Sequence, residues 1–159
     1  MVELTLYFNT VGVLPAGVWQ YVFPAGRKLP HLRDLNIYTY QGLADPAPLS
    51  AWGEADISAL VSCCPNLRKI PYLTLQHGSH VSELHKLTAL TSLDLTYGTG
   101  GVAAVEESLK ALADVTQLQK LNVSVVNQDL TVTNLLPLTS LTALSGFGFS
   151  CMRTLMRTT

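Results

Sequence analysis

The chain has 159 residues, enough for one domain with a sizeable core, and charged residues make up only 13% of it. Its formal net charge is -1, which gives no general attraction to nucleic acid or to an anionic membrane surface. Polar residues or glycine interrupt every apolar stretch before it reaches the about 20 residues that a membrane-spanning helix needs. No basic segment typical of a signal peptide precedes the first apolar stretch.

The cysteines indicate a reducing compartment. Cys63, Cys64 and Cys151 are too few and too unevenly spaced for a disulfide framework. We therefore expect a cytoplasmic or nuclear protein that makes no contact with a membrane.

The N-terminal residues predict a short strand and then an irregular connection. Residues 2–6 alternate apolar and polar side chains, as the end of a truncated repeat would. Residues 11–26 mix glycine, proline and aromatic residues, and we expect a helix or a loop that closes the first turn of the chain.

A leucine phrase of the form LxxLxL recurs along the rest of the chain. It stands at residues 32–37, 90–95 and 118–123, with a looser copy at 67–72 and a degraded one that begins at 141. The second leucine of each copy, or its replacement, falls at position 4, 35, 70, 93, 121 or 144. The later steps between these positions lie in the range of about 20–29 residues that is typical of a leucine-rich repeat, and the first two need insertions.

The phrase predicts a short strand whose two alternate apolar side chains point to one face, after a turn that the first leucine anchors. A single repeat cannot bury that face alone, so neighbouring repeats must stack. We predict an α/β fold: one domain of residues 1–159, a curved leucine-rich-repeat solenoid with about five strands in a parallel sheet on the concave side and helices and loops outside. The repeats are clearest in residues 29–149, and 1–28 and 150–159 are expected to be irregular ends.

The segments between the strands predict short helices. Ile57, Leu60, Val61 and Cys64 have the spacing of one apolar helix face, and Pro65 forbids the helix from continuing. The same spacing recurs at Val105, Leu109 and Leu112.

Other connections carry weaker signals. Val81 and Leu84 predict about one helical turn, residues 43–52 a loop insertion, residues 98–101 a strand-to-helix turn, and residues 130–138 an irregular connection.

Two positions of the pattern are ambiguous or weak. Residues 70–75 contain two overlapping copies of the phrase, so the register of that repeat stays open between them. The last strand, at residues 145–149, has glycines where packing leucines are expected, which predicts a loose final repeat.

The chain resembles the leucine-rich repeat superfamily over about residues 29–149, and its Cys64-Pro65-Asn66-Leu67 segment resembles the cysteine-containing repeats of plant and algal F-box proteins. In that family a helix ends in Cys-Pro-x-Leu and leads directly into the next strand. The resemblance implies a protein partner gripped by the repeats, as in the substrate receptors of ubiquitin ligases. The F-box segment itself has no counterpart here.

In repeats of this type the residues between the leucines point outward from the inner curve and meet the partner. Tyrosine and arginine are typical anchors of protein interfaces. The predicted partner-binding residues are Asp34, Asn36, Tyr38, Arg68, Lys69, Asp94, Tyr97, Lys120 and Asn122.

No catalytic residue, metal site, cofactor or small-molecule substrate is predicted. His77, His80 and His85, with Glu83 among them, are read as loop histidines rather than zinc ligands. Cys63 and Cys64 lack the CxxC spacing of redox pairs, and Cys64 continues an apolar stripe, so burial is expected.

Two alternatives to partner binding stay open. The chain is a structural or truncated repeat fragment without a dedicated ligand, or it is a small enzyme that uses the region of residues 77–85.

Overall fold

The computed structural model describes residues 2–8, 17–39, 52–75, 78–97, 101–126 and 132–152. The predicted loop insertion before Trp52, the glycine-rich turn at 98–100 and His77 lie outside these residues. The elements in chain order are β1 (Glu3–Phe8), α1 (Val18–Val22), β2 (Asp34–Thr39), α2 (Glu54–Cys63), β3 (Lys69–Leu75), the 3-10 helix η1 (Gly78–Lys86), β4 (Ser92–Tyr97), α3 (Gly101–Ala111), η2 (Leu112–Asp114), β5 (Lys120–Val126), η3 (Val132–Ser140) and β6 (Gly146–Met152).

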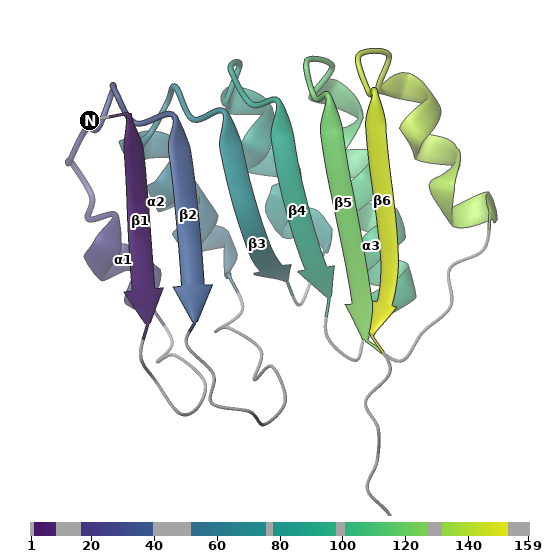
Figure 1. The fold of residues 1–159 in the computed structure, drawn as a ribbon, viewed down its shortest axis with the longest axis horizontal. Coiled ribbons are helices and arrows are strands. Elements are labelled where there is room, and N and C mark those ends of the chain that lie inside the picture. Colours follow the sequence, from purple (N-terminus) through teal and green to yellow (C-terminus); the bar gives the residue numbers. More distant parts are fainter. Residues whose placement is uncertain are drawn as a thin grey trace, which may run out of the picture.

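The strands form one parallel sheet whose spatial order is the order of the chain, β1-β2-β3-β4-β5-β6. The helices lie behind this sheet and leave its other face open (Figure 1). The predicted α/β class, parallel sheet and outer helices are confirmed, with six strands instead of about five. The sheet is not strongly curled, so the predicted curvature is not shown.

In most repeats the leucine phrases pair across the sheet in the predicted register. Leu4 pairs with Leu35, and Leu93 pairs with Ile70 on one side and Leu121 on the other. Because equivalent positions stack, their side chains share one core behind the sheet, where all but Leu4 are fully buried.

The last repeat has a different register from the predicted one. Leu121 pairs with Phe147, so Leu144 is the first residue of its phrase and not the second. The glycines of β6, Gly146 and Gly148, consequently stand at outward positions. Phe147 and Phe149 take the positions that leucines hold in the other strands, with side chains that stay 38% and 40% exposed at the end of the sheet. The prediction that glycines replace the packing residues is wrong because it counted the phrase three residues too early.

The same hydrogen-bonded turn precedes each of β2 to β6. The backbone N–H of Leu90 donates to Leu87 O at 3.0 Å, and Leu32, Leu67, Leu118 and Leu144 make the equivalent bond to the residue three positions earlier. The carbonyl just before each of β1 to β5 then accepts two N–H groups from the next turn. Thr91 O, for example, accepts from Gln119 and Lys120, both at 2.9 Å.

Helix α2 forms where the apolar spacing predicted it. Its Ile57 and Leu60 are fully buried, and the Asp56 carboxylate accepts the Gly53 N–H at 3.0 Å at the first turn. The helix ends at Cys63, before the proline. The stripe at Val105, Leu109 and Leu112 is also fully buried.

Two connections differ from the prediction. Residues 132–140 form η3 rather than an irregular segment, and η1 runs for nine residues where one turn was expected. A 3-10 helix repeats every three residues, so the i, i+4 spacing of an α-helix gives no sign of it.

Beneath the first strands lies an aromatic cluster. Trp19 of α1 stacks on Trp52 with ring centroids 4.0 Å apart, and Phe23 lies 6.3 Å from Trp52. All three side chains are fully buried, so α1 packs over the first turns of the sheet. Of residues 11–26, for which a helix or a loop was expected, residues 17–26 contain this short helix and residues 11–16 lie outside the described residues.

No described helix has both the length and the hydropathy that are needed to cross a bilayer.

Candidate functional site

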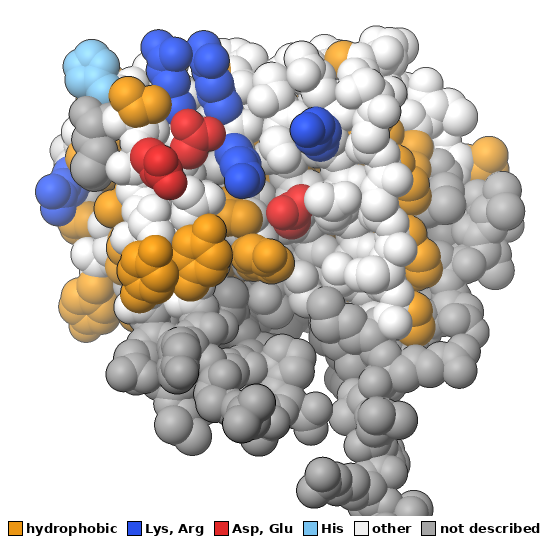
Figure 2. All heavy atoms as spheres, in the orientation of Figure 1, with side chains coloured by type: hydrophobic (Ala, Val, Ile, Leu, Met, Phe, Trp, Pro, Cys, Tyr) orange, Lys and Arg blue, Asp and Glu red, His pale blue; other side chains and the backbone are white. Residues whose placement is uncertain are grey.

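The open face of the sheet presents the outward residues of the strands (Figure 2). The structure places most of the predicted partner-binding residues there or at the edge where the strands begin, with exposed or half-buried side chains. These are Asp34, Asn36, Tyr38, Arg68, Lys69, Asp94, Lys120 and Asn122.

Tyr97 is the exception, because its side chain is only 1% exposed. In β4 the buried positions alternate, so Tyr97 points to the helices together with Leu93 and Leu95. The prediction that it meets a partner is wrong. Burial raises the pKa of the Tyr97 hydroxyl, with a smaller opposing effect of the nearby Ser108 side chain and a further increase from the Glu107 charge.

Three tyrosines, which we call the tyrosine cluster, stand exposed on the first three strands. Tyr7, Tyr38 and Tyr72 are 78%, 48% and 53% exposed. Tyr7 pairs with Tyr38 across the strands, and their rings stack with centroids 5.3 Å apart and an interplanar angle of 18°. Figure 2 shows an apolar patch on this part of the face.

Of these three tyrosines, only Tyr38 is among the residues predicted from the sequence to bind a partner. Tyr7 alternates with Leu4 and Leu6, so the period of two already placed it outward. Tyr72 had no such signal, because it lies in the ambiguous phrase at 70–75.

Tyr72 occupies a β-bulge. Ile70 pairs with Leu93 and Leu73 with Leu95, so β3 holds one more residue than β4 over this interval, and both overlapping copies of the phrase are used. The φ angle of Tyr72 is 55°, in the left-handed region that a tyrosine rarely adopts. The bulge turns its ring to the open side.

Polar side chains of neighbouring strands bond to one another beside the tyrosine cluster. Asn36 donates to the Glu3 carboxylate at 2.6 Å, and Asn122 donates to the Asp94 carboxylate at 2.6 Å. These bonds fix the positions of predicted binding residues before any partner arrives.

The histidine region does not converge on one point. His80 Nδ1 lies 3.2 Å from Trp52 O, and His85 Nδ1 lies 2.5 Å from Ser82 O within its own helix. Glu83 forms an ion pair with Lys86. Among the described residues, no three His, Cys, Asp or Glu side chains are grouped as metal ligands would be.

The vicinal cysteines are buried, as predicted for Cys64. Cys63 and Cys64 are 1% and 0% exposed, and neither is in a disulfide. Burial, with a contribution from the adjacent Cys63, raises the pKa of Cys64 to about 12. A thiol with such a pKa stays protonated near neutral pH, which does not suit a nucleophile.

The open face therefore offers aromatic and hydrogen-bonding groups on a rigid sheet, an arrangement that suits noncovalent recognition. Comparison of the sequence with protein-family models and with curated proteins gives no match.

Proposed function

We propose that the chain is a leucine-rich-repeat module that recognises a protein partner through the open face of its sheet, with the tyrosine cluster at the centre of the interface. The observation that carries this proposal is the stacked, exposed pair Tyr7 and Tyr38 on adjacent strands. A large exposed aromatic group in a fixed position is typical of an interface anchor.

The conformation of Tyr72 supports the same conclusion. A left-handed conformation costs a residue other than glycine roughly 1–2 kcal/mol, and local backbone strain of this kind concentrates at binding sites. Here the strained residue is the third exposed tyrosine of the same cluster. A partner that contacts the Tyr72 ring would offset the cost of this backbone conformation.

The regular repetition supports a solenoid of leucine-rich repeats. The strands follow one another in chain order, the same turn precedes each of β2 to β6, and β1 to β5 contribute their apolar side chains to one shared core. A chain built in this way presents one long face, which suits a partner of macromolecular size.

The test is affinity capture with three forms of the full chain as bait, read by mass spectrometry. The forms are the native chain, the double variant Tyr38→Ser/Tyr72→Ser, and the control Tyr21→Ser. Tyr21 is 87% exposed and lies on α1, outside the tyrosine cluster. Interface anchors contribute about 1–2 kcal/mol or more each, so the purified partner should bind the double variant at least about tenfold more weakly.

Thermal melting of all three baits establishes that they are equally folded. A dominant partner that is retained by the native chain and the control and lost by the double variant supports the proposal. Ubiquitin-ligase adaptor subunits recovered with that partner would extend it to substrate recognition for a ligase. A partner held equally by all three forms, or chaperones alone on the native chain, would contradict recognition through this face and favour a repeat fragment without a ligand.

A further inference from the structure

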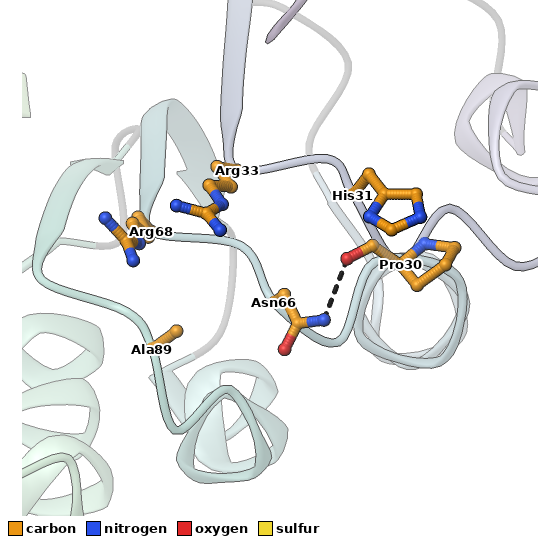
Figure 3. Close-up of a pocket in the computed structure, with 6 residues that line it drawn as sticks. All are labelled: Pro30, His31, Arg33, Asn66, Arg68 and Ala89. Atoms are coloured by element: carbon orange, nitrogen blue, oxygen red, sulfur yellow. Dashed lines mark hydrogen bonds between the residues drawn. The ribbon is translucent and has the colours of Figure 1, made fainter. Parts of the chain in front are cut away.

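A second feature lies at the edge of the sheet where the strands begin, away from the tyrosine cluster. It is a hollow of about 290 Å³ formed by the turns that lead into β2, β3 and β4 (Figure 3). The residues that line it are Pro30, His31, Arg33, Asn66, Arg68 and Ala89.

The two arginines occupy the same place in successive repeats. Arg33 directly precedes β2, and Arg68 directly precedes β3. Arg33 O accepts the backbone N–H of Arg68 at 2.7 Å and of Lys69 at 3.2 Å. These bonds hold the two arginines on adjacent strands of the sheet, whose spacing is about 4.8 Å. Their guanidinium groups lie next to one another in Figure 3.

Neither guanidinium has a counter-charge within the described part of the chain. The ion pairs there are Lys86 with Glu83 and Lys110 with Glu106, both on the helices. No hydrogen bond to another described residue occupies the side chain of Arg33 or Arg68. Each side chain therefore keeps its donors for a ligand, and two like charges held close together favour an anion between them.

The wall opposite the arginines is fixed. The side-chain amide of Asn66 donates to Pro30 O at 2.8 Å and ties the turn before β3 to the turn before β2. Ala89 lies in the turn before β4, at the position that Asn66 has in the turn before β3, and its small side chain leaves space inside the hollow. The hollow thus has a rigid rim and an open interior.

We propose that this hollow binds a phosphate group, with Arg33 and Arg68 donating to its oxygens. A phosphate monoester carries about -1.5 to -2 charges at neutral pH and matches two guanidinium groups better than a single carboxylate does. The planar fork of each guanidinium fits two phosphate oxygens. The group is supplied either by a phosphorylated residue of a protein or by free inorganic phosphate. The site is independent of the tyrosine cluster.

The experiment is a titration of the ¹⁵N-labelled full chain with inorganic phosphate, followed through the arginine side-chain N–H signals. A parallel titration with potassium chloride at matched ionic strength separates binding from screening. The variants are Arg33→Gln, Arg68→Gln and the control Arg27→Gln, which removes an exposed arginine outside the hollow. None of these side chains packs in the core, so unchanged melting is expected.

The proposal predicts saturable shifts at Arg33 and Arg68 with phosphate and not with chloride. Each of the two hollow variants should weaken binding about tenfold, because a charge-assisted hydrogen bond is lost, while Arg27→Gln should not. A final arm uses N-acetyl-phosphoserine amide. Tighter binding than inorganic phosphate assigns the site to a phosphorylated protein, and weaker or equal binding assigns it to free phosphate. Shifts that do not saturate, that chloride reproduces, or that all three variants reduce equally would overturn the proposal.

Discussion

At the scale of single residues, Tyr97 differs from the exposed tyrosines because both its ring and its hydroxyl are buried. Its ring fills the core behind β4, while its hydroxyl is removed from water and lies near Ser108. The neutral hydroxyl is the form that this environment accepts, because burial penalises the phenolate.

This burial predicts a loss of stability at alkaline pH. The folded pKa of Tyr97 lies above the ordinary value of 10.0, so its contribution is complete below pH 10 and falls as the pH rises beyond 10 and the unfolded chain ionises. Between pH 8 and pH 11 the free energy of unfolding of the native chain should fall by about 1 kcal/mol more than that of Tyr97→Phe.

Urea unfolding at steps of one pH unit measures this difference, with Tyr21→Phe as the control for an exposed tyrosine. Cys64 adds a loss of the same sign from about pH 9 upward, and it does so equally in all three proteins. Parallel pH profiles of the native chain and Tyr97→Phe would show that the hydroxyl titrates freely in the folded state.

The residues of the candidate site were predictable where the strand alternation was simple. The period of two from Leu93 and Leu95 already places Tyr97 inward, and the period from Leu4 and Leu6 places Tyr7 outward. Tyr72 was not predictable in this way, because a bulge changes the parity of the residues that follow it. The left-handed backbone that aims its ring depends on pairing with β4, which sequence alone does not specify.

At the scale of elements, β6 shows why a glycine stands at position 148. Gly148 pairs with Asn122, and a methyl group at Gly148 would overlap the side-chain oxygen of Asn122. The absence of a side chain lets the Asn122 amide lie over β6 while it donates to Asp94 at 2.6 Å. Gly148 therefore leaves the space that the hydrogen bond between Asn122 and Asp94 needs on the open face.

A double-mutant cycle tests this interaction. Gly148→Ala should lower the free energy of unfolding by up to about 1 kcal/mol, because Asn122 must move and its exposed hydrogen bond to Asp94 is lost. In the background of Asn122→Ala the same change should be neutral or stabilising, since alanine suits a strand better than glycine. Denaturant unfolding of the four proteins gives the coupling energy. Equal effects of Gly148→Ala in both backgrounds would show that the two residues are not coupled.

Among the elements, α2, α3 and most strands followed from their spacing, and α1 and the 3-10 helices did not. Helix α2 has four apolar residues at α-helical intervals and a proline after its last turn. Helix η3 contains Pro137 and has no such interval, and its three-residue repeat leaves no α-helical spacing in the sequence from which it could be predicted.

At the scale of the whole molecule, each strand pairs only with its neighbours in the chain. The aromatic cluster of Trp19, Phe23 and Trp52 lies under the first strands, and the backbone N–H of Trp52 donates to Thr74 O of β3 at 2.8 Å. A substitution that destabilises this cluster should therefore affect β1 to β3 most. Each strand interacts only with its neighbours, so a local loss of stability is transmitted weakly along the sheet.

Trp52→Ala should cost about 3–5 kcal/mol, the usual range for removing a buried tryptophan. Amide hydrogen exchange should show a larger loss of protection in β1–β3 than in β5 and β6. Leu121→Ala, a buried change in β5, provides the converse comparison and should affect β5 and β6 most. A uniform loss across all six strands in both variants would mean that the sheet unfolds as a single cooperative unit.

The carbonyl before each strand has a consequence for how such a chain evolves. Positions 33, 68, 91 and 119 each accept two backbone N–H groups from the next turn. The sheet is held mainly by the main chain at these positions, with one added hydrogen bond from the Thr91 hydroxyl to Arg68 O at 3.3 Å. Natural selection can therefore exchange the side chains at positions 33, 68 and 119 at little cost in stability. Thr91 and Gln119 occupy the equivalent position in the two repeats that follow Arg68, so an arginine or lysine substituted at either would extend the row of positive charge. The edge of the sheet is thus a site at which new ligand preferences can arise by single mutations while the fold stays the same.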